Sequence, residues 1–170
     1  MSQHPSEQQV DLHELAARLI RQLVERDLTI ATCESLTGGG IAYTLTQVPG
    51  ASKVVRGGLI TYASDLKVEL AGVDADWVRR FGVINETTAV EMARGTLDVC
   101  RARVAVACTG VAGPDPQDGH QPGDVWLAVA IHAEPQPDIL TRHLRLEGDR
   151  EQVRRQAISQ ALQMVLDQMR

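Results

Sequence analysis

Aromatic residues are scarce in this chain of 170 residues, which has two Trp, two Tyr and one Phe. Hydrophobic residues still make up 44% of the sequence, so a core must be built from Val, Leu, Ile and Ala. A chain of this length buries about two-thirds of the surface that it exposes when unfolded, and it needs no disulfides to fold. We therefore expect a polar N-terminal tail over residues 1–9 and a single domain over residues 10–170.

Other shortages exclude several classes of protein. The three cysteines are odd in number and lack metal-type spacing, which is typical of reduced thiols in the cytoplasm. No stretch reaches the roughly 18 apolar residues of a membrane span, and the first nine residues lack the apolar part of a secretion signal. The net charge of -5, without a basic block flanked by aromatics, disfavours nucleic acid. We expect a cytoplasmic protein that binds neither membrane nor nucleic acid; a homo-oligomer stays open.

Periodic hydrophobic patterns predict alternating helices and strands. Helices are expected over about 10–26, after the glycines to about 47, and over 64–70, 74–80, 86–101 and 149–170. Strands are expected over 28–33, 57–62, 103–108, 124–132 and 139–146. The loop 110–123 holds four Gly and three Pro, which is typical of a functional segment. The order predicts a three-layer α/β/α domain with a mostly parallel or mixed sheet, its last two strands antiparallel.

A serine stands at the first predicted turn from strand to helix, in the segment E-S-L-T-G-G-G over residues 34–40. Unpaired N–H groups and the helix dipole favour negative charge at such a turn. Ser35 is therefore a candidate nucleophile, and the N–H groups near Thr37, Gly38 and Gly39 are candidate substrate or oxyanion contacts. A simple helix cap formed by Ser35 or Thr37 is the alternative. The segment matches neither the G-x-S-x-G elbow nor the phosphate loop.

A serine nucleophile needs a base, and no histidine stands in a triad context. The chain has only two lysines, Lys53 and Lys67. Lys67 lies on the predicted helix after the second strand, whose end carries Tyr62, and it can act as a base if burial lowers its pKa. An ordinary surface lysine is the alternative. Ser64 completes an S-x-x-K pattern with Lys67, but we expect it to cap its helix.

Two more segments carry candidate substrate contacts. Thr109 follows the third strand at a Gly-rich turn, where it either contacts a substrate or stabilises the turn. Arg150 opens the last helix and can grip a phosphate with help from the dipole, with a solvated ion pair as the alternative. Ligands lie beyond the carboxyl ends of strands in such sheets, and Ser35, Tyr62 and Thr109 each follow a predicted strand, so one crevice can hold all three. Cys33 and Cys108 are rival nucleophiles, but strand cysteines are usually buried and apolar. No His, Asp and Glu cluster indicates a metal.

Five motifs occur in order along the chain: E-S-L-T-G-G at 34–39, G-L-I-T-Y at 58–62 with Lys67, T-G-V-A-G-P at 109–114, P-G-D-V-W at 122–126, and G-D-R at 148–150 with R-R-Q-A at 154–157. Together they resemble the CinA C-terminal domain family from about residue 12 to 168. The resemblance implies nicotinamide-nucleotide amidase activity without a cofactor. This reaction converts nicotinamide mononucleotide and water to nicotinate mononucleotide and ammonia in pyridine nucleotide salvage.

By position, the resemblance implies that Ser35 is the nucleophile and Lys67 its base, with Tyr62, Thr109 and Arg150 supporting the site. The chain departs from the family pattern at Leu36, where a small residue or Cys is frequent. That departure leaves open a nucleotide-binding or interaction module that has the same fold and no turnover. A serine amidase acting on another small amide is a second alternative.

Overall fold

The central sheet has five strands in the order β2, β1, β3, β4, β5 in this computed structural model, which describes residues 11–169. The strands are β1 (Ile30–Glu34), β2 (Val55–Ile60), β3 (Val104–Gly110), β4 (Asp124–Ile131) and β5 (Asp138–Arg145). β1 pairs in parallel with β2 and β3, whereas β4 pairs antiparallel with both β3 and β5. The sheet is therefore mixed, and its antiparallel part comprises the predicted pair β4 and β5 together with the pairing of β3 and β4. The predicted tail over residues 1–9 lies outside the described residues.

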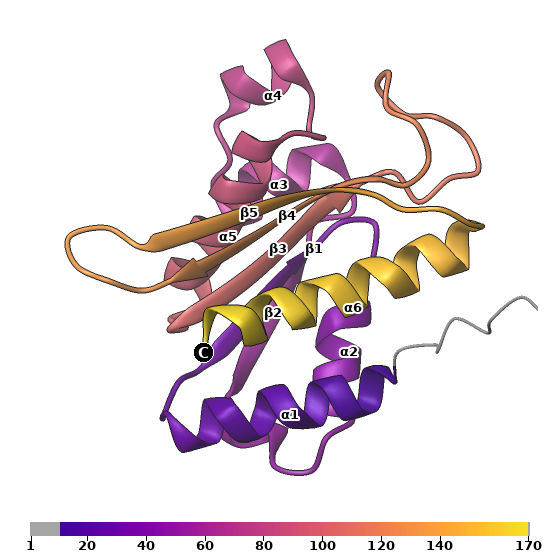
Figure 1. Cartoon of the computed structure of the whole chain (residues 1–170). Coiled ribbons are helices and arrows are strands. Elements are labelled where there is room, and N and C mark those ends of the chain that lie inside the picture. The colour runs from indigo at the N-terminus through magenta and orange to yellow at the C-terminus, as the bar shows by residue number, and fades with distance from the viewer. Residues whose placement is uncertain (1–10, 170) are drawn as a thin grey trace, which may run out of the picture.

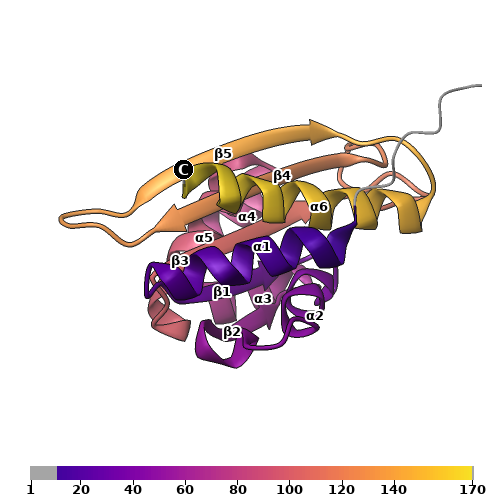
Figure 2. The ribbon, with the colours of Figure 1, turned by 60° about the horizontal axis from the view of Figure 1, so that its bottom comes forward.

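Helices cover both faces of the sheet, as predicted (Figure 1). One face carries α1 (Leu12–Glu25), α2 (Gly40–Thr46) and α6 (Arg150–Gln168), with α1 and α6 side by side in both views (Figure 2). The other carries α3 (Ser64–Ala71) and α5 (Glu86–Cys100), and α4 (Ala75–Phe81) projects from this side. A short 3₁₀ turn, η1 (Ala51–Lys53), precedes β2. The result is the expected α/β/α arrangement.

The aliphatic core divides into two parts because β3 is buried on both faces. Val104, Val106 and Cys108 face the α1 and α6 side, and Ala105 and Ala107 face α5. The small alanines let α5 approach the sheet closely, and α3 in turn packs on α5. This packing fixes α3 relative to the carboxyl ends of β1 and β2.

Local capping follows the sequence in part. Asn85 caps α5 by accepting a hydrogen bond from the Thr88 N–H, and Gly72 closes α3 in the left-handed conformation, both as predicted. The expectation that Ser64 caps α3 is wrong: the cap position is Ala63, and Ser64 is already the first helical residue. Within the described residues, no helix is long and apolar enough to cross a membrane.

Candidate active site

Ser35 and Lys67 meet beyond the carboxyl ends of β1 and β2. Ser35 directly follows β1, and Lys67 lies on α3. The Lys67 Nζ lies 3.0 Å from the Ser35 Oγ and 2.6 Å from the carbonyl oxygen of Thr61. Ser35 is 8% exposed and Lys67 only 1%. The structure thus brings the two residues together in a place sheltered from bulk water, and it excludes the surface-lysine alternative.

Burial sets the electrostatics of Lys67. Desolvation lowers the pKa of its ammonium group, and the neighbouring Cys33, Cys108 and Asp65 offset this only in part. Among residues 11–169, no carboxylate forms an ion pair with Lys67. A lysine in this position is more readily neutral than a surface lysine, so it can accept a proton.

A cavity of about 300 Å³ opens beside the pair. It is lined by Ser35 and Lys67 and by the predicted residues Tyr62, Thr109 and Arg150. The Gly-rich and Pro-rich loop supplies a long stretch of wall, over residues 110–117. Apolar side chains complete the lining: Leu36, Val83, Ile84, Val111 and Ala112. The crevice expected at the carboxyl ends of the parallel strands is therefore present.

Arg150 spans the rim of this cavity. Its guanidinium donates one hydrogen bond to the Tyr62 hydroxyl and one to the carbonyl oxygen of Gly113, each at 2.7 Å. Tyr62 is 57% exposed, so this contact lies at the mouth rather than beside Ser35. The guanidinium has five N–H donors, and these two bonds leave others for an anion.

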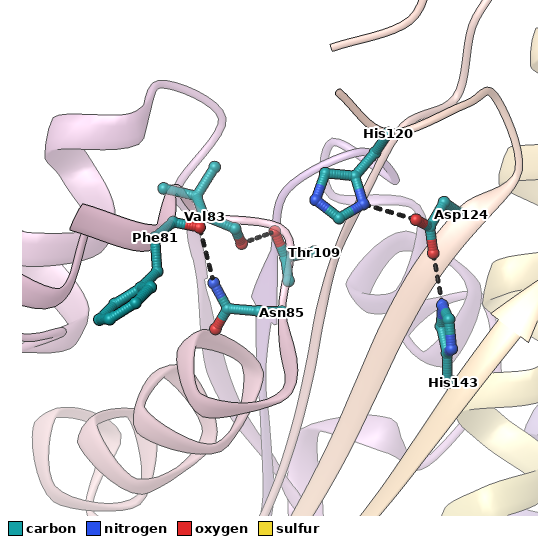
Figure 3. Close-up of polar contacts among 7 residues, drawn as sticks. All are labelled: Phe81, Val83, Asn85, Thr109, His120, Asp124 and His143. Carbon is teal, nitrogen blue, oxygen red and sulfur yellow. Dashed lines mark hydrogen bonds and ion pairs between the residues drawn. The ribbon is translucent and has the colours of Figure 1, made fainter. Parts of the chain in front are cut away.

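Thr109 is fully buried, and its hydroxyl donates to the carbonyl oxygen of Val83 at 2.8 Å (Figure 3). Of its two predicted roles, this contact favours the stabilising one, because it ties β3 to the segment that supplies Val83 and Ile84 to the cavity. Asn85 fixes the same segment from the other side, with its amide donating to the carbonyl oxygens of Phe81 and Gly82. Thr109 therefore shapes the cavity wall.

The turn after Ser35 lies beside the cavity without lining it beyond Leu36. The Gly38 N–H donates to the Ser35 carbonyl at 3.0 Å, and the Thr37 hydroxyl is fully buried against Glu34. Within residues 11–169, the backbone N–H groups of Leu36 and Thr37 have no hydrogen-bond partner. The Gly39 N–H likewise has no partner among the described residues, so the turn leaves the N–H groups of Leu36, Thr37 and Gly39 free, and of the predicted donors Gly38 alone is engaged.

Three features of the site region were not predicted from the sequence. Glu34 is completely buried beneath the turn, and Arg154 contacts the turn rather than the cavity. Asp124 lies between two histidines, with its carboxylate bound by His120 and by the short contact of His143 (Figure 3). Partial burial raises the pKa of Asp124, but the histidine contacts outweigh this and lower it overall. The cluster anchors the base of the 111–123 loop to the sheet.

The rival nucleophiles Cys33 and Cys108 are fully buried. Burial raises the pKa of the Cys33 thiol, and it raises that of Cys108 to about 12, with the charge of Glu34 acting in the same direction. Both thiols therefore stay protonated at neutral pH and are poor nucleophiles.

The fold and the site define a layered α/β protein with a serine and a lysine paired at the switch from strand to helix. A family model, the CinA C-terminal domain, matches residues 12–169. The chain belongs to this family.

Relatives fall into a short and a long form. Nicotinamide-nucleotide amidohydrolase PncC of Escherichia coli K12 is 36% identical over 159 residues, which cover 93% of this chain and 94% of that protein. A CinA-like protein of Frankia casuarinae is 41% identical over 84% of this chain and 32% of its own length. The chain spans about a third of the length of several curated relatives that it matches. The crystal structure of a competence/damage inducible protein from Agrobacterium tumefaciens has a TM-score of 0.86 at 36% identity, covering 98% of each chain.

Proposed function

We propose that this chain is an amidohydrolase that converts nicotinamide mononucleotide and water to nicotinate mononucleotide and ammonia. The observation that carries the proposal is the buried contact of 3.0 Å between the Lys67 Nζ and the Ser35 Oγ at the wall of a cavity. The substrate class comes from the similar Escherichia coli protein, whose name is nicotinamide-nucleotide amidohydrolase. The cavity, at about 300 Å³, is of the size that small-molecule sites have.

In the proposed mechanism, Lys67 takes the Ser35 proton as the hydroxyl oxygen attacks the carboxamide carbon. A neutral amine has two N–H groups and one lone pair. If one N–H donates to the Thr61 carbonyl, the lone pair can turn toward the Ser35 hydroxyl. The resulting ammonium then gives the proton to the leaving nitrogen, so ammonia departs and an acyl-enzyme ester remains. Water, deprotonated by the same amine, hydrolyses the ester and restores Ser35.

Backbone donors stabilise the tetrahedral intermediate in this scheme. The free N–H groups of Leu36 and Thr37 follow the nucleophile directly, as oxyanion donors commonly do. One donor of this kind contributes about 100- to 1,000-fold to kcat. The scheme needs neither a metal nor an organic cofactor.

The phosphate of the substrate is assigned to Arg150 at the rim, with the Tyr62 hydroxyl beside it. Tyr62 is exposed at the cavity mouth, whereas the lining residues Val83 and Val111 are apolar and buried. This division suits a ligand with an aromatic ring at one end and a dianion at the other. Tyr62 also remains a candidate for orienting the hydrolytic water.

Ammonia release from nicotinamide mononucleotide tests the proposal, with wild type and Ser35→Ala assayed side by side. We expect turnover by the wild type and none by Ser35→Ala. Ser64→Ala is the matched control, because it removes an equivalent hydroxyl near Lys67 that has no hydrogen bond to the amine. Nicotinamide and its riboside complete the panel. Equal rates on all three amides would indicate another small-amide hydrolase, and calorimetric binding without ammonia would indicate the non-catalytic module.

A further inference from the structure

Thr37 is held from two sides by charged residues that come from different elements. Its hydroxyl donates to the Glu34 Oε2 at 2.7 Å, and its carbonyl oxygen accepts from the Arg154 Nη2 at 2.9 Å. Glu34 ends β1 and Arg154 lies on α6, 117 residues further along the chain than Thr37. Neither charged side chain lines the cavity.

Glu34 takes the place of the missing cap of α2. The cap position of that helix is Gly39, which has no side chain to offer. Glu34 reaches over instead and accepts the N–H groups of Ile41 at 2.9 Å and Ala42 at 2.8 Å. The carboxylate is completely buried, and the helix N-terminus stabilises its charge. Since this charge is satisfied there, Glu34 forms no ion pair with Lys67.

The backbone of the turn has little else to hold it. Gly38 and Gly39 have φ values of 59° and 94°, in the left-handed region of backbone conformation. Glycine adopts this region without strain, but it adopts other conformations equally readily, so these residues do not fix the turn by themselves. The turn has two backbone hydrogen bonds of its own, from Gly38 to Ser35 and from Gly40 to Thr37. The Thr37 hydroxyl also lies 3.1 Å from the Cys108 Sγ, a neutral contact. Glu34 and Arg154 are the charged partners of Thr37, so they supply the strongest of the contacts that orient its peptide group.

We propose that Glu34 and Arg154 are positioning residues that hold Thr37 from two sides; we call these two contacts the Thr37 clamp. By fixing the turn, the clamp orients the Ser35 hydroxyl toward Lys67. It also orients the N–H groups of Leu36 and Thr37 toward the oxyanion. The inference takes its substrate from the proposed function, but its geometric argument does not depend on that function. In this arrangement the hydroxyl and the carbonyl group of Thr37 hold the turn in place, and the Thr37 side chain does not contact the substrate.

The test replaces Thr37 by valine, which keeps the side-chain shape and removes the hydroxyl. A hydrogen bond to a charged group is lost, so kcat should fall about 10- to 100-fold. KM should change by less than about threefold, because the cavity lining is untouched. Thr37→Ser should restore most of the lost kcat. Thr44→Val is the matched control: it removes a buried hydroxyl bond of 2.7 Å within α2, away from Glu34, and should keep wild-type kcat.

Arg154→Leu removes the other charged partner of Thr37 and leaves the buried Glu34 unchanged. We expect the same fall in kcat, with KM nearly constant. A second readout needs no amide substrate: the rate at which a fluorophosphonate probe labels Ser35, followed by intact mass. Labelling should slow in Thr37→Val and Arg154→Leu and not in Thr44→Val.

The two readouts separate the failures. Labelled wild type that releases no ammonia would refute the proposed substrate while the labelling rates still test the clamp. Variants with a lowered melting temperature but wild-type kcat and labelling would overturn the inference, because the contacts would then be structural only. Wild type that neither reacts with the probe nor releases ammonia would overturn both proposals.

Discussion

Replacing Gly95 by alanine should damage catalysis far more than stability, although Gly95 does not line the cavity. Gly95 lies on α5 where that helix meets the end of α3. A Cβ added there would lie 2.7 Å from the carbonyl carbon of Ala71 and closer still to its oxygen. Non-bonded carbon atoms prefer about 3.5–4.0 Å, so α3 must move by about 1 Å.

The shift of α3 should affect the rate of catalysis much more than the free energy of unfolding. Lys67 lies one turn before Ala71 on the same helix, so the movement carries its amine out of the 3.0 Å contact with Ser35. A misplacement of about 1 Å can cost about 100-fold in rate. For stability, alanine gains about 1 kcal/mol over glycine in a helix, while overpacking costs about 1–3 kcal/mol. The net loss of unfolding free energy is therefore about 0–2 kcal/mol.

Ammonia release and thermal unfolding of Gly95→Ala measure both quantities on one preparation. Arg94→Ala, an exposed change on the same helix, is the control and should leave both near wild type. A Gly95→Ala protein that is folded and has wild-type kcat would refute the reasoning, since it would show that the α3 to α5 packing does not set the position of Lys67.

Three further outcomes follow from the site. Lys67→Arg should be nearly as inactive as Lys67→Ala in the ammonia assay, because arginine keeps the charge but does not deprotonate; wild-type turnover would remove lysine as the base. Lys67→Met should be inactive yet more stable at pH 7 in denaturant titrations. The folded pKa of Lys67 lies below the unfolded value of about 10.4, so wild-type stability should rise with pH up to that value, and this rise should be absent in Lys67→Met. Arg150→Ala should raise KM for the nucleotide by roughly 10- to 100-fold, and much less for the riboside; equal effects would place the phosphate elsewhere.

Local patterns were enough to predict most of the fold. The 3.6-residue period marked α1, α5 and α6, and the back-to-back strands marked the antiparallel pair β4 and β5, because these signals lie within one short segment each. The ends shifted by a few residues, as with β2, predicted at 57–62 and found at 55–60. α3 begins at residue 64 as predicted, so Ser64 is its first helical residue and the cap position falls on Ala63.

The site was predictable as a set of positions but not as a set of contacts. Ser35 and Lys67 follow neighbouring strands, so topology alone brings them to one edge. Glu34 escaped notice because capping patterns consider the residue at the helix start, whereas this carboxylate comes from the preceding strand, six residues before the helix. Asp124 and His143 meet only once the register of β4 and β5 is known, since Trp126 is the partner opposite His143.

Helix α6 contributes Arg150 to the rim and Arg154 to the turn, although it is the last of the described elements to leave the ribosome. Chains are made at about 5–20 residues per second and fold from the N-terminal side first. A nascent chain that ends before residue 150 carries Ser35 and Lys67 but neither arginine, and the face of α1 that α6 covers is still bare. With the proposed function, hydrolytic activity would appear only after α6 has been synthesised and has docked on the rest of the domain. Ammonia release would then report the completion of folding.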